Sequence, residues 1–429
     1  MSEARSGVEI ELRRERGAKA GSAAVRGHEP GAPLPSDQQP PVASPSNGFE
    51  FEHVTSDEGL ARLEPEWLDL FARSGTRNPF AHPAWVRAWL QNFAPKVDQR
   101  VVVTARFDGQ LVAVAPLVAR AHGPSRFHAR SLELVGSGAA RADRFTEMTE
   151  ILVAREGRRK TLRALLHHLT LERPTDWDWL VVTLPHDQGW FEEEWLPAAW
   201  LRRGARALHR ATLPFVVMPL PSTWGELPLK HNMKEAIRRS KNRLASGAAP
   251  PEMLFAEGAD AVAAIARLQE LHSRRATLEG HRAHDDYFAH EATARFARDG
   301  ALALAGAGSA TVAELNVGGA TIASRLVLRA NDGLFLSYSG VDPEQWRLGA
   351  PTFLIAACIR RAIEQGDKLI NLSLIPDSAK LRWSEQLELH NEFVVVAPTQ
   401  RAQRMFAAYW HVRASRALRR GPSSPEPSA

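Results

Sequence analysis

One short cationic stretch near the end of the chain has the residue types needed to hold negative charge. Lys380, Arg382 and Trp383 follow residues 368–374, an apolar run that predicts a buried strand. Lysine is scarce here, with eight residues in a chain of 429, so its position is informative. A lysine in such a place can bind a phosphate or stabilise the charge that develops on a carbonyl oxygen under attack. Asp377 is placed to orient it, and a solvated loop lysine is the alternative interpretation.

Attack by an amine or hydroxyl also needs a group that takes up a proton, usually a carboxylate or a histidine with a pKa near neutral. The sequence offers His272 and Glu270 in a helical stretch, Glu314 in a strand-like stretch and Asp143 in a polar loop. A lone histidine in a helix is more often structural, which is the alternative for His272. The residue pattern does not choose the base among these four.

Residues 230–245 predict a helix with a cationic face. Lys230, Lys234 and Arg238 recur at intervals of four residues, and Lys241 lies close to them. Such a face suits an anionic acceptor, a tRNA or a membrane surface. The alternative is the solvated face of a helix that packs on the core through its apolar side.

The elements that must position these groups occur in one order twice. Each copy predicts helices, an antiparallel meander with glycine-containing turns, a loop, a helix and a further strand. The first copy has strands at 100–106, 111–118 and 131–135, a helix at 157–171 and a strand at 179–184. The second has strands at 311–317, 320–328 and 334–339, a helix at 351–365 and a strand at 368–374. The repetition predicts a duplicated α/β domain with mixed sheets flanked by helices.

Composition sets the domain boundaries. Residues 1–48 are dense in Pro, Gly, Ser and Gln over much of their length and predict a disordered N-terminal tail. The two copies then occupy 49–214 and 215–400, and 401–429 reads as a basic helix followed by a disordered end.

The overall composition excludes several classes of protein. Hydrophobic residues make up 44% and charged residues 24% of the chain, and no run approaches the roughly 20 apolar residues that span a bilayer. Cys358 is the single cysteine, so it forms no intrachain disulfide, and it sits among apolar residues as a buried side chain. A net charge of +5 is weak evidence for nucleic-acid binding. We therefore expect a cytoplasmic protein with no metal, no DNA partner, no transmembrane segment and at most a peripheral contact with membranes.

In the order of its elements the chain resembles the GNAT acyltransferase fold. It is most similar to the CelD-like acetyltransferases of cellulose and exopolysaccharide gene clusters, which are tandem GNAT proteins distantly similar to Fem-type aminoacyltransferases. The likeness covers about residues 50–400. The residues that carry it are Trp67, Asn78-Pro79-Phe80, Pro83, Trp85, Trp89, Asp108-Gly109, Ala115-Pro116-Leu117, 234–243, Leu271-His272, Arg275, 338–342 and 379–383.

The resemblance implies a cofactor loop at the start of the helix at 351–365. GNAT enzymes hold the CoA pyrophosphate on backbone N–H groups at this point, which here gives Gly349 and Ala350, with Asp342 and Arg347 lining the loop. Pro351 departs from the family pattern because it has no N–H to donate. Ala379 is a second departure, since relatives often carry Tyr before the lysine.

The resemblance also implies the function. It predicts transfer of an acyl group, most readily acetyl, from acyl-CoA to an amine or hydroxyl of a sugar, amino-sugar or other envelope precursor, with no covalent enzyme intermediate. Lys380 and Arg382 would stabilise charge, Tyr338 would protonate the leaving thiolate unless it is a packed strand residue, and Trp383 would wall the site. Asp143, Arg238 and Lys241 would meet the acceptor. Fem-like transfer from aminoacyl-tRNA and a catalytically silent assembly partner remain as alternatives.

Overall fold

A computed structural model gives the structure of residues 48–93, 99–123, 128–137, 145–172, 177–185, 206–247, 249–276 and 285–420. All of these described residues belong to one compact unit. Most of the predicted N-terminal tail lies outside the described residues. No helix within the described ranges is both long and apolar enough to cross a bilayer.

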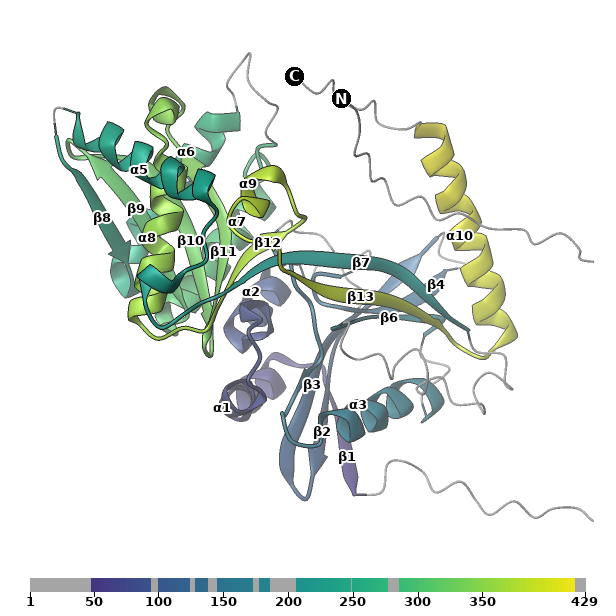
Figure 1. Cartoon of the computed structure of the whole chain (residues 1–429). Helices are drawn as coiled ribbons and strands as arrows, with labels where there is room; N and C mark the ends of the chain where they lie inside the picture. Colours follow the sequence, from purple (N-terminus) through teal and green to yellow (C-terminus); the bar gives the residue numbers. More distant parts are fainter. Residues whose placement is uncertain are drawn as a thin grey trace, which may run out of the picture. The chain divides into compact units, whose positions relative to one another are not determined.

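The first copy of the pattern, called here the N-terminal repeat, runs from β1 to β6 (Figure 1). Its elements are β1 (Phe49–Val54), α1 (Asp57–Ser74), η1 (Pro79–Ala81), α2 (Pro83–Phe93), β2 (Gln99–Phe107), β3 (Gln110–His122), β4 (Ala129–Leu134), β5 (Leu152–Val153), α3 (Arg158–His167), η4 (His168–Glu172) and β6 (Trp179–Pro185). The expected hairpin turn is present, since Phe107 pairs with Gln110 across Asp108 and Gly109, both at positive φ.

The second copy, called the C-terminal repeat, runs from β8 to β12 and is preceded by a further helix, α5. The elements are η6 (Trp224–Glu226), α5 (His231–Ala245), β8 (Pro251–Ala256), η7 (Gly258–Asp260), α6 (Ala261–Ala276), α7 (Glu291–Gly306), β9 (Ala310–Val317), β10 (Ala320–Ala330), β11 (Gly333–Val341), η8 (Pro343–Leu348), α8 (Ala350–Glu364) and β12 (Leu369–Leu374). The duplication predicted from the sequence is confirmed, because strand, two helices, meander, helix and parallel strand follow in the same order in both repeats.

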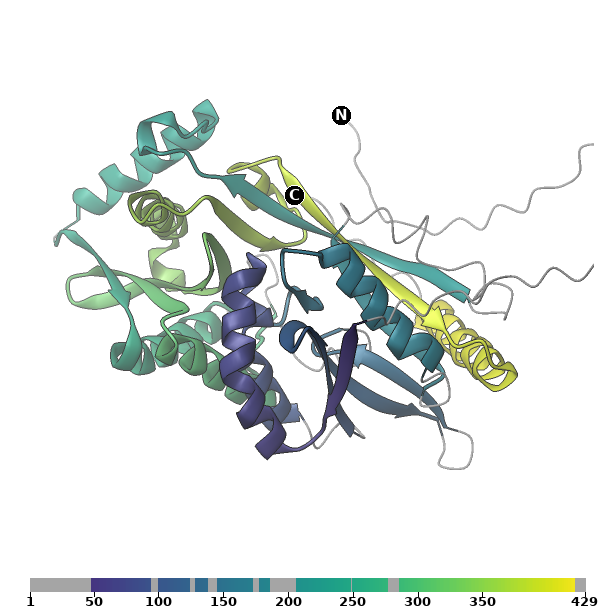
Figure 2. The same ribbon diagram turned by 90° about the horizontal axis from the view of Figure 1, so that it is seen from below.

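Two long strands that the sequence did not predict join the repeats. β7 (Arg206–Pro219) and β13 (Leu387–Val396) pair with each other along most of their length. β7 follows the N-terminal repeat in the chain but pairs with β12 of the C-terminal repeat. β13 follows the C-terminal repeat but pairs with β6 of the N-terminal repeat. The result is one mixed sheet in the order β1-β2-β3-β4-β6-β13-β7-β12-β11-β10-β9-β8. Figures 1 and 2 show β7 and β13 side by side from one repeat to the other.

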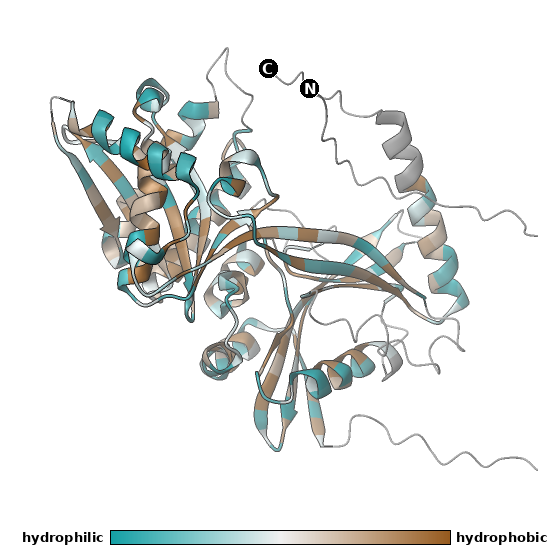
Figure 3. Cartoon of the chain, viewed as in Figure 1, coloured by the Kyte–Doolittle hydropathy of each residue, from teal (hydrophilic) through white to brown (hydrophobic). Residues whose placement is uncertain are grey.

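Two helical layers cover the C-terminal repeat on opposite faces of its sheet. Because successive side chains of a strand point to opposite faces, Leu326 and Leu328 of β10 pack with α6 and α7, whereas Val327 packs with α8. α5 lies over α8 and shows mostly hydrophilic residues (teal in Figure 3). The helix α9 (Ser378–Leu381) follows β12, and α10 (Gln400–Arg420), predicted as a basic helix, follows β13.

Candidate active site

The site is built where two parallel strands part. β11 and β12 pair only at their beginnings, Gly333–Phe335 with Leu369–Asn371, and then diverge. A cavity of about 650 Å³ lies at this fork. It is lined by Met233, Arg275, Asp285, Tyr287, Arg325, Leu336, Ser339, Val341, Trp346, Pro351, Thr352, Ile355, Leu372, Asp377, Ser378, Ala379, Lys380, Arg382 and Trp383.

Positive charge dominates the cavity wall. Four cationic side chains line it, Arg275, Arg325, Lys380 and Arg382, against the two carboxylates of Asp285 and Asp377. Burial lowers the pKa of Arg275, of Arg325 and of Lys380, because each is removed from water. A cavity with this balance attracts an anionic ligand.

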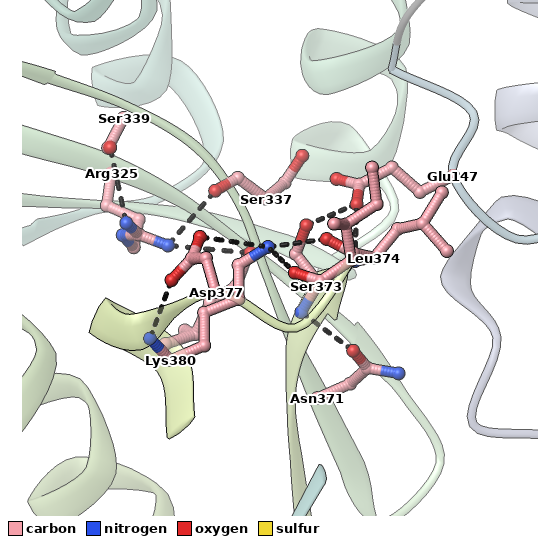
Figure 4. A network of polar contacts seen from close by, with 11 residues as sticks. Glu147, Arg325, Ser337, Ser339, Asn371, Ser373, Leu374, Asp377 and Lys380 are labelled. Atoms are coloured by element: carbon pink, nitrogen blue, oxygen red, sulfur yellow. Dashed lines mark hydrogen bonds and ion pairs between the residues drawn. The ribbon is translucent and has the colours of Figure 1, made fainter. Parts of the chain in front are cut away.

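Lys380 is positioned by a tight turn after β12. Ser373 and Ile375 both have positive φ, at 83° and 65°, a conformation that L residues rarely adopt. The turn aims two carbonyl groups at the ammonium, and Lys380 Nζ donates to Leu374 O at 2.5 Å and to Ile375 O at 3.1 Å (Figure 4). Asp377 accepts from the Lys380 backbone N–H at 2.9 Å and holds a carboxylate oxygen 3.9 Å from Nζ. The predicted role of Asp377 as an orienting group fits this geometry.

Arg325 is a residue of this cavity that the sequence analysis missed. It is on β10 opposite Ser339, next to a bulge where β11 carries one more residue than β10 between 325 and 327. Its guanidinium donates to Ser337 O at 3.2 Å and to Ser339 Oγ at 3.2 Å. Strand alternation places this side chain on the α8 face with Val327, in the layer that contains the cavity.

Glu147, from the N-terminal repeat, is a second residue that the sequence analysis missed, and it does not line the cavity but contacts the Ser373–Leu374 turn at the end of β12. It accepts hydrogen bonds from the Ser373 hydroxyl and, at 2.9 Å, from the Leu374 N–H (Figure 4). Burial raises the pKa of its carboxyl, while these two hydrogen bonds and the nearby Lys380 act in the opposite direction. The only sequence signal is a carboxylate shortly after the polar loop 136–144, and no local pattern indicates that it reaches the other repeat.

His272 and Tyr338 lie outside the cavity wall. His272 is buried, with Nδ1 2.8 Å from Ser339 O and Nε2 3.3 Å from Asp285 O, so it supports two residues that line the cavity. Tyr338 points to the opposite face of β11, where its hydroxyl donates to Ala297 O at 3.2 Å. Burial raises its pKa. Both positions match the structural alternatives stated for these residues.

The start of α8 uses most of its backbone donors internally. The Gly349 N–H donates to Trp346 O, and the N–H groups of Thr352 and Phe353 donate to Gly349 O. Ser240 of α5 packs against Gly349 and donates to its carbonyl oxygen at 2.7 Å. Pro351 and Thr352 line the cavity, whereas Gly349 and Ala350 do not. Their predicted contact with a pyrophosphate stays a prediction.

The remaining predicted residues are spread around this centre. Asp342 caps η8 and pairs with Arg274 at 3.1 Å, and Arg347 offers its carbonyl oxygen to Arg243. Arg238 and Lys241 are exposed on α5, away from the cavity lining. Asp143 lies outside the described residues.

The other carboxylates considered as bases also lie away from the cavity lining. Glu314 is buried in a bidentate pair with Arg267, with distances of 2.8 and 2.6 Å. Glu270 is exposed on α6. Neither residue lines the cavity. Within the described residues, no three His, Cys, Asp or Glu side chains gather as metal ligands.

A second cavity, also of about 650 Å³, lies in the N-terminal repeat. It is formed by the β2–β3 turn and the start of α3, and Phe49, Phe107 and Lys160 are among its lining residues. It is not at a strand fork, and Lys160 stacks over the two phenylalanine rings. The fork cavity is the better candidate because it combines an open strand pair with buried charge.

Residues 231–380 match the family model described as an acetyltransferase (GNAT) domain. This match begins at the start of α5, contains the whole C-terminal repeat and ends at Lys380. No protein among those with curated functions gives a significant sequence match to the chain.

Solved structures share the fold at low sequence identity. The structure of FemX is 10% identical, with a TM-score of 0.53 over 80% of this chain and 96% of that one. A conserved protein of unknown function from Bacteroides thetaiotaomicron is 14% identical, with a TM-score of 0.51 over 81% and 99%. A tandem GNAT protein from the clavulanic acid biosynthesis pathway is 14% identical, with a TM-score of 0.42 over 82% and 99%. At these identities the likeness concerns the fold, and the chain has a tandem GNAT-like α/β fold.

Proposed function

We propose that the chain is an acyltransferase that moves an acyl group, most readily acetyl, from acyl-CoA to an amine or hydroxyl. By its resemblance to CelD-like proteins, the acceptor is a sugar, an amino sugar or another precursor of the cell envelope or an exopolysaccharide. The observation that carries the proposal is the open fork between β11 and β12, with Lys380 held at its end by two carbonyl groups.

The residues at the fork fit an acyl-CoA. The cavity of about 650 Å³ reaches from the parted strands to Pro351 and Thr352 at the start of α8, where the positive end of the helix dipole lies. Bound acyl-CoA supplies an activated acyl group. The exposed side chain of Arg347, next to the lining residue Trp346, is the group that would hold its phosphates, and Lys380 and Arg382 lie on the wall beside the reacting end.

Glu147, which lies against the Ser373–Leu374 turn and not on the cavity lining itself, serves as the base in this proposal. Its raised pKa suits proton uptake closer to neutral pH than for an ordinary glutamate, and Oε2 is fixed by Ser373 and Leu374. The amine or hydroxyl of the acceptor attacks the acyl carbon and loses its proton to this carboxylate, and the acyl–sulfur bond breaks to release CoA as a thiolate that takes a proton from solvent. Lys380 stabilises the negative charge that develops on the acyl oxygen.

Transfer is direct, without an acyl-enzyme. Cys358 is buried on α8, and burial raises the pKa of its thiol to about 12. A thiol in this state is not a nucleophile at neutral pH. Its predicted burial is confirmed.

A thermal-shift titration with acetyl-CoA tests the proposal. Ligand at 100 times its dissociation constant adds about 2.7 kcal/mol to the native state, so a saturable rise in melting temperature is expected. Arg347→Ala should weaken this shift, whereas Arg360→Gln, an exposed change outside the cavity lining, should leave it intact. No shift with acetyl-CoA or longer acyl-CoAs would overturn the proposal.

One observation favours a second candidate, aminoacyl transfer from tRNA. α5 exposes Lys234, Arg238, Arg239, Lys241 and Arg243 within three turns, a surface suited to a polyanion. This candidate predicts salt-sensitive tRNA binding that fails when Lys234 and Lys241 are both changed to Ala. A silent assembly partner predicts neither ligand.

A further inference from the structure

We propose that the fork cavity recognises a carboxylate on one of its two substrates, and that Arg325 is the residue that binds it. This inference rests on the proposed function, since it names a substrate class for the same site. The carboxylate belongs either to a dicarboxylic acyl group or to an acidic acceptor.

The hydrogen bonds of the Arg325 guanidinium leave one of its nitrogen atoms without a partner. The guanidinium donates only to neutral oxygens, the carbonyls of Leu336 and Ser337 and the hydroxyl of Ser339. Its Nε is buried without a hydrogen-bond partner, and the Ser337 hydroxyl is buried without one too. A buried polar group without a partner is costly, so the Nε of Arg325, a residue of the cavity lining, points to a group that the ligand supplies.

Two other arginines of the C-terminal repeat each form an ion pair with a carboxylate of the chain. Arg267 pairs with Glu314 and Arg329 pairs with Asp367. Among the described residues, no carboxylate lies within ion-pair distance of Arg325, although the side chain is enclosed by protein. A buried guanidinium without an ion pair is expensive, and a ligand carboxylate would supply one.

The neighbours of Arg325 add to the deficit of negative charge. Arg275 lines the same cavity and stacks over the Trp346 ring at 5.1 Å, with no ion pair to a described carboxylate. Arg325 is close to Lys380. Burial is the main cause of the lowered pKa of the Lys380 ammonium, and repulsion by the Arg325 guanidinium lowers it further. Glu147 and Asp377 attract Arg325 through space without forming an ion pair with it, and their effect on its pKa is smaller than that of burial.

Geometry favours a carboxylate. The Nε edge of a guanidinium presents two parallel N–H groups, which match the two oxygens of a carboxylate. The Ser339 hydroxyl lines the cavity, lies beside this guanidinium and can complete the site. An acyl chain or acceptor reacting near Lys380 would place a carboxylate a few atoms away on Arg325.

A purely structural role for Arg325 makes a different prediction. In that case the guanidinium only satisfies carbonyls at the β11 bulge. Its replacement would then lower stability but leave the preference between acidic and neutral ligands unchanged.

The test compares matched pairs of ligands by calorimetry on the full chain. The acyl pair is succinyl-CoA and butyryl-CoA, which have four-carbon acyl groups and differ in the terminal carboxylate. The acceptor pair is D-glucuronate and D-glucose, measured with and without saturating acetyl-CoA. We expect the acidic member of one pair to bind at least about tenfold more tightly than the neutral member. The pair that shows the preference identifies the source of the carboxylate.

Arg325→Gln should abolish this preference, and Arg325→Lys should retain part of it. If Arg325→Gln does not fold, Arg275→Gln is the second variant, and it should reduce the preference severalfold. Arg360→Gln is the control, because Arg360 stacks over Trp224 in the same way but outside the cavity lining. No preference in either pair, or a preference that survives Arg325→Gln, would overturn the inference. Failure of acetyl-CoA itself to bind would instead count against the proposed function, and the glucuronate arm without acetyl-CoA would still test Arg325.

Discussion

The two repeats have the same order of elements but use the strand fork differently. β4 and β6 pair over Ser131–Glu133 and Trp179–Val181, three positions, as β11 and β12 do. In the C-terminal repeat the fork opens into a cavity of about 650 Å³, whereas beside Thr183 and Glu150 of the N-terminal repeat the cavity is only about 20 Å³.

The N-terminal fork is filled by the chain itself. In residues 145–150, Thr149 donates to the Thr183 hydroxyl at 2.9 Å, and Thr146 accepts from the Trp85 indole at 3.0 Å. Gly136 has a φ of +81°, and a Cβ there would lie 2.4 Å from the Thr146 side chain, so only glycine allows this close approach.

Residues 145–150, which fill the fork of the N-terminal repeat, also contact the C-terminal repeat at the end of β12. Glu147 and Glu150 are three residues apart, yet Glu147 bonds to Ser373 of the C-terminal repeat and Glu150 bonds to Thr76 of its own repeat. Duplication therefore allows one repeat to give up its ligand space and contribute a side chain to the site of its neighbour.

Changing the two glutamates separately gives the largest contrast. Glu147→Gln should lower kcat by about 10²–10⁴-fold because the amide cannot take up a proton. Glu150→Gln should leave kcat within about twofold, since Glu150 faces the closed fork. Steady-state rates with acetyl-CoA measure both. Equal losses in the two variants would show that the effect is structural.

The lysine at the open fork gives the next largest effect. Lys380→Ala should reduce kcat by roughly 10²–10³-fold, the cost of removing one stabilising donor. Lys368→Ala, an exposed change at the other end of β12, should have no measurable effect. Full activity of Lys380→Ala would remove it from the proposed reaction.

Stability against pH should show what the two glutamates share. Burial raises the pKa of both above the ordinary value of 4.5. The stability that each protonated carboxyl contributes is fully present below pH 4.5 and is lost as the pH rises through its folded-state pKa. As the pH rises, the free energy of unfolding of the wild type should therefore fall relative to that of each Gln variant. The fall should be about 1.4 kcal/mol for each unit by which folding raises the pKa. Urea denaturation at pH 5 and pH 8 measures this, and a constant difference for Glu147→Gln would contradict its raised pKa.

The cavity of the N-terminal repeat should give the smallest effect. Lys160 lies 4.2 Å from the Phe107 ring centroid and 5.4 Å from that of Phe49. Lys160→Met should cost about 0.5–1 kcal/mol of unfolding free energy and leave turnover unchanged. Loss of acetyl-CoA binding in this variant would indicate that the cofactor binds in the N-terminal repeat, contrary to the difference between the two repeats described above.

Local patterns determined the repeated architecture. Alternating strands with Asp108-Gly109 or Gly318-Gly319 turns predicted both meanders, and the structure has these strands with the same pairing. The apolar run at 368–374 predicted a strand that ends shortly before Lys380, Arg382 and Trp383. These three residues line the cavity. These signals succeed because hairpin turns and strand alternation depend on near neighbours in sequence.

The proposed base, Glu147, and the buried arginine without an ion pair, Arg325, could be found only in the tertiary structure. Glu147 lies 226 residues from Ser373, and its role depends on a segment that folds into one repeat and ends at the other. Arg325 looks like any cation on an alternating strand, and only the missing carboxylate around it marks it out. The sequence alone determined which elements form and which strand ends carry charge. Burial, the exchange of β7 and β13 and the filling of one fork were decided by contacts between distant residues, which local propensities do not encode.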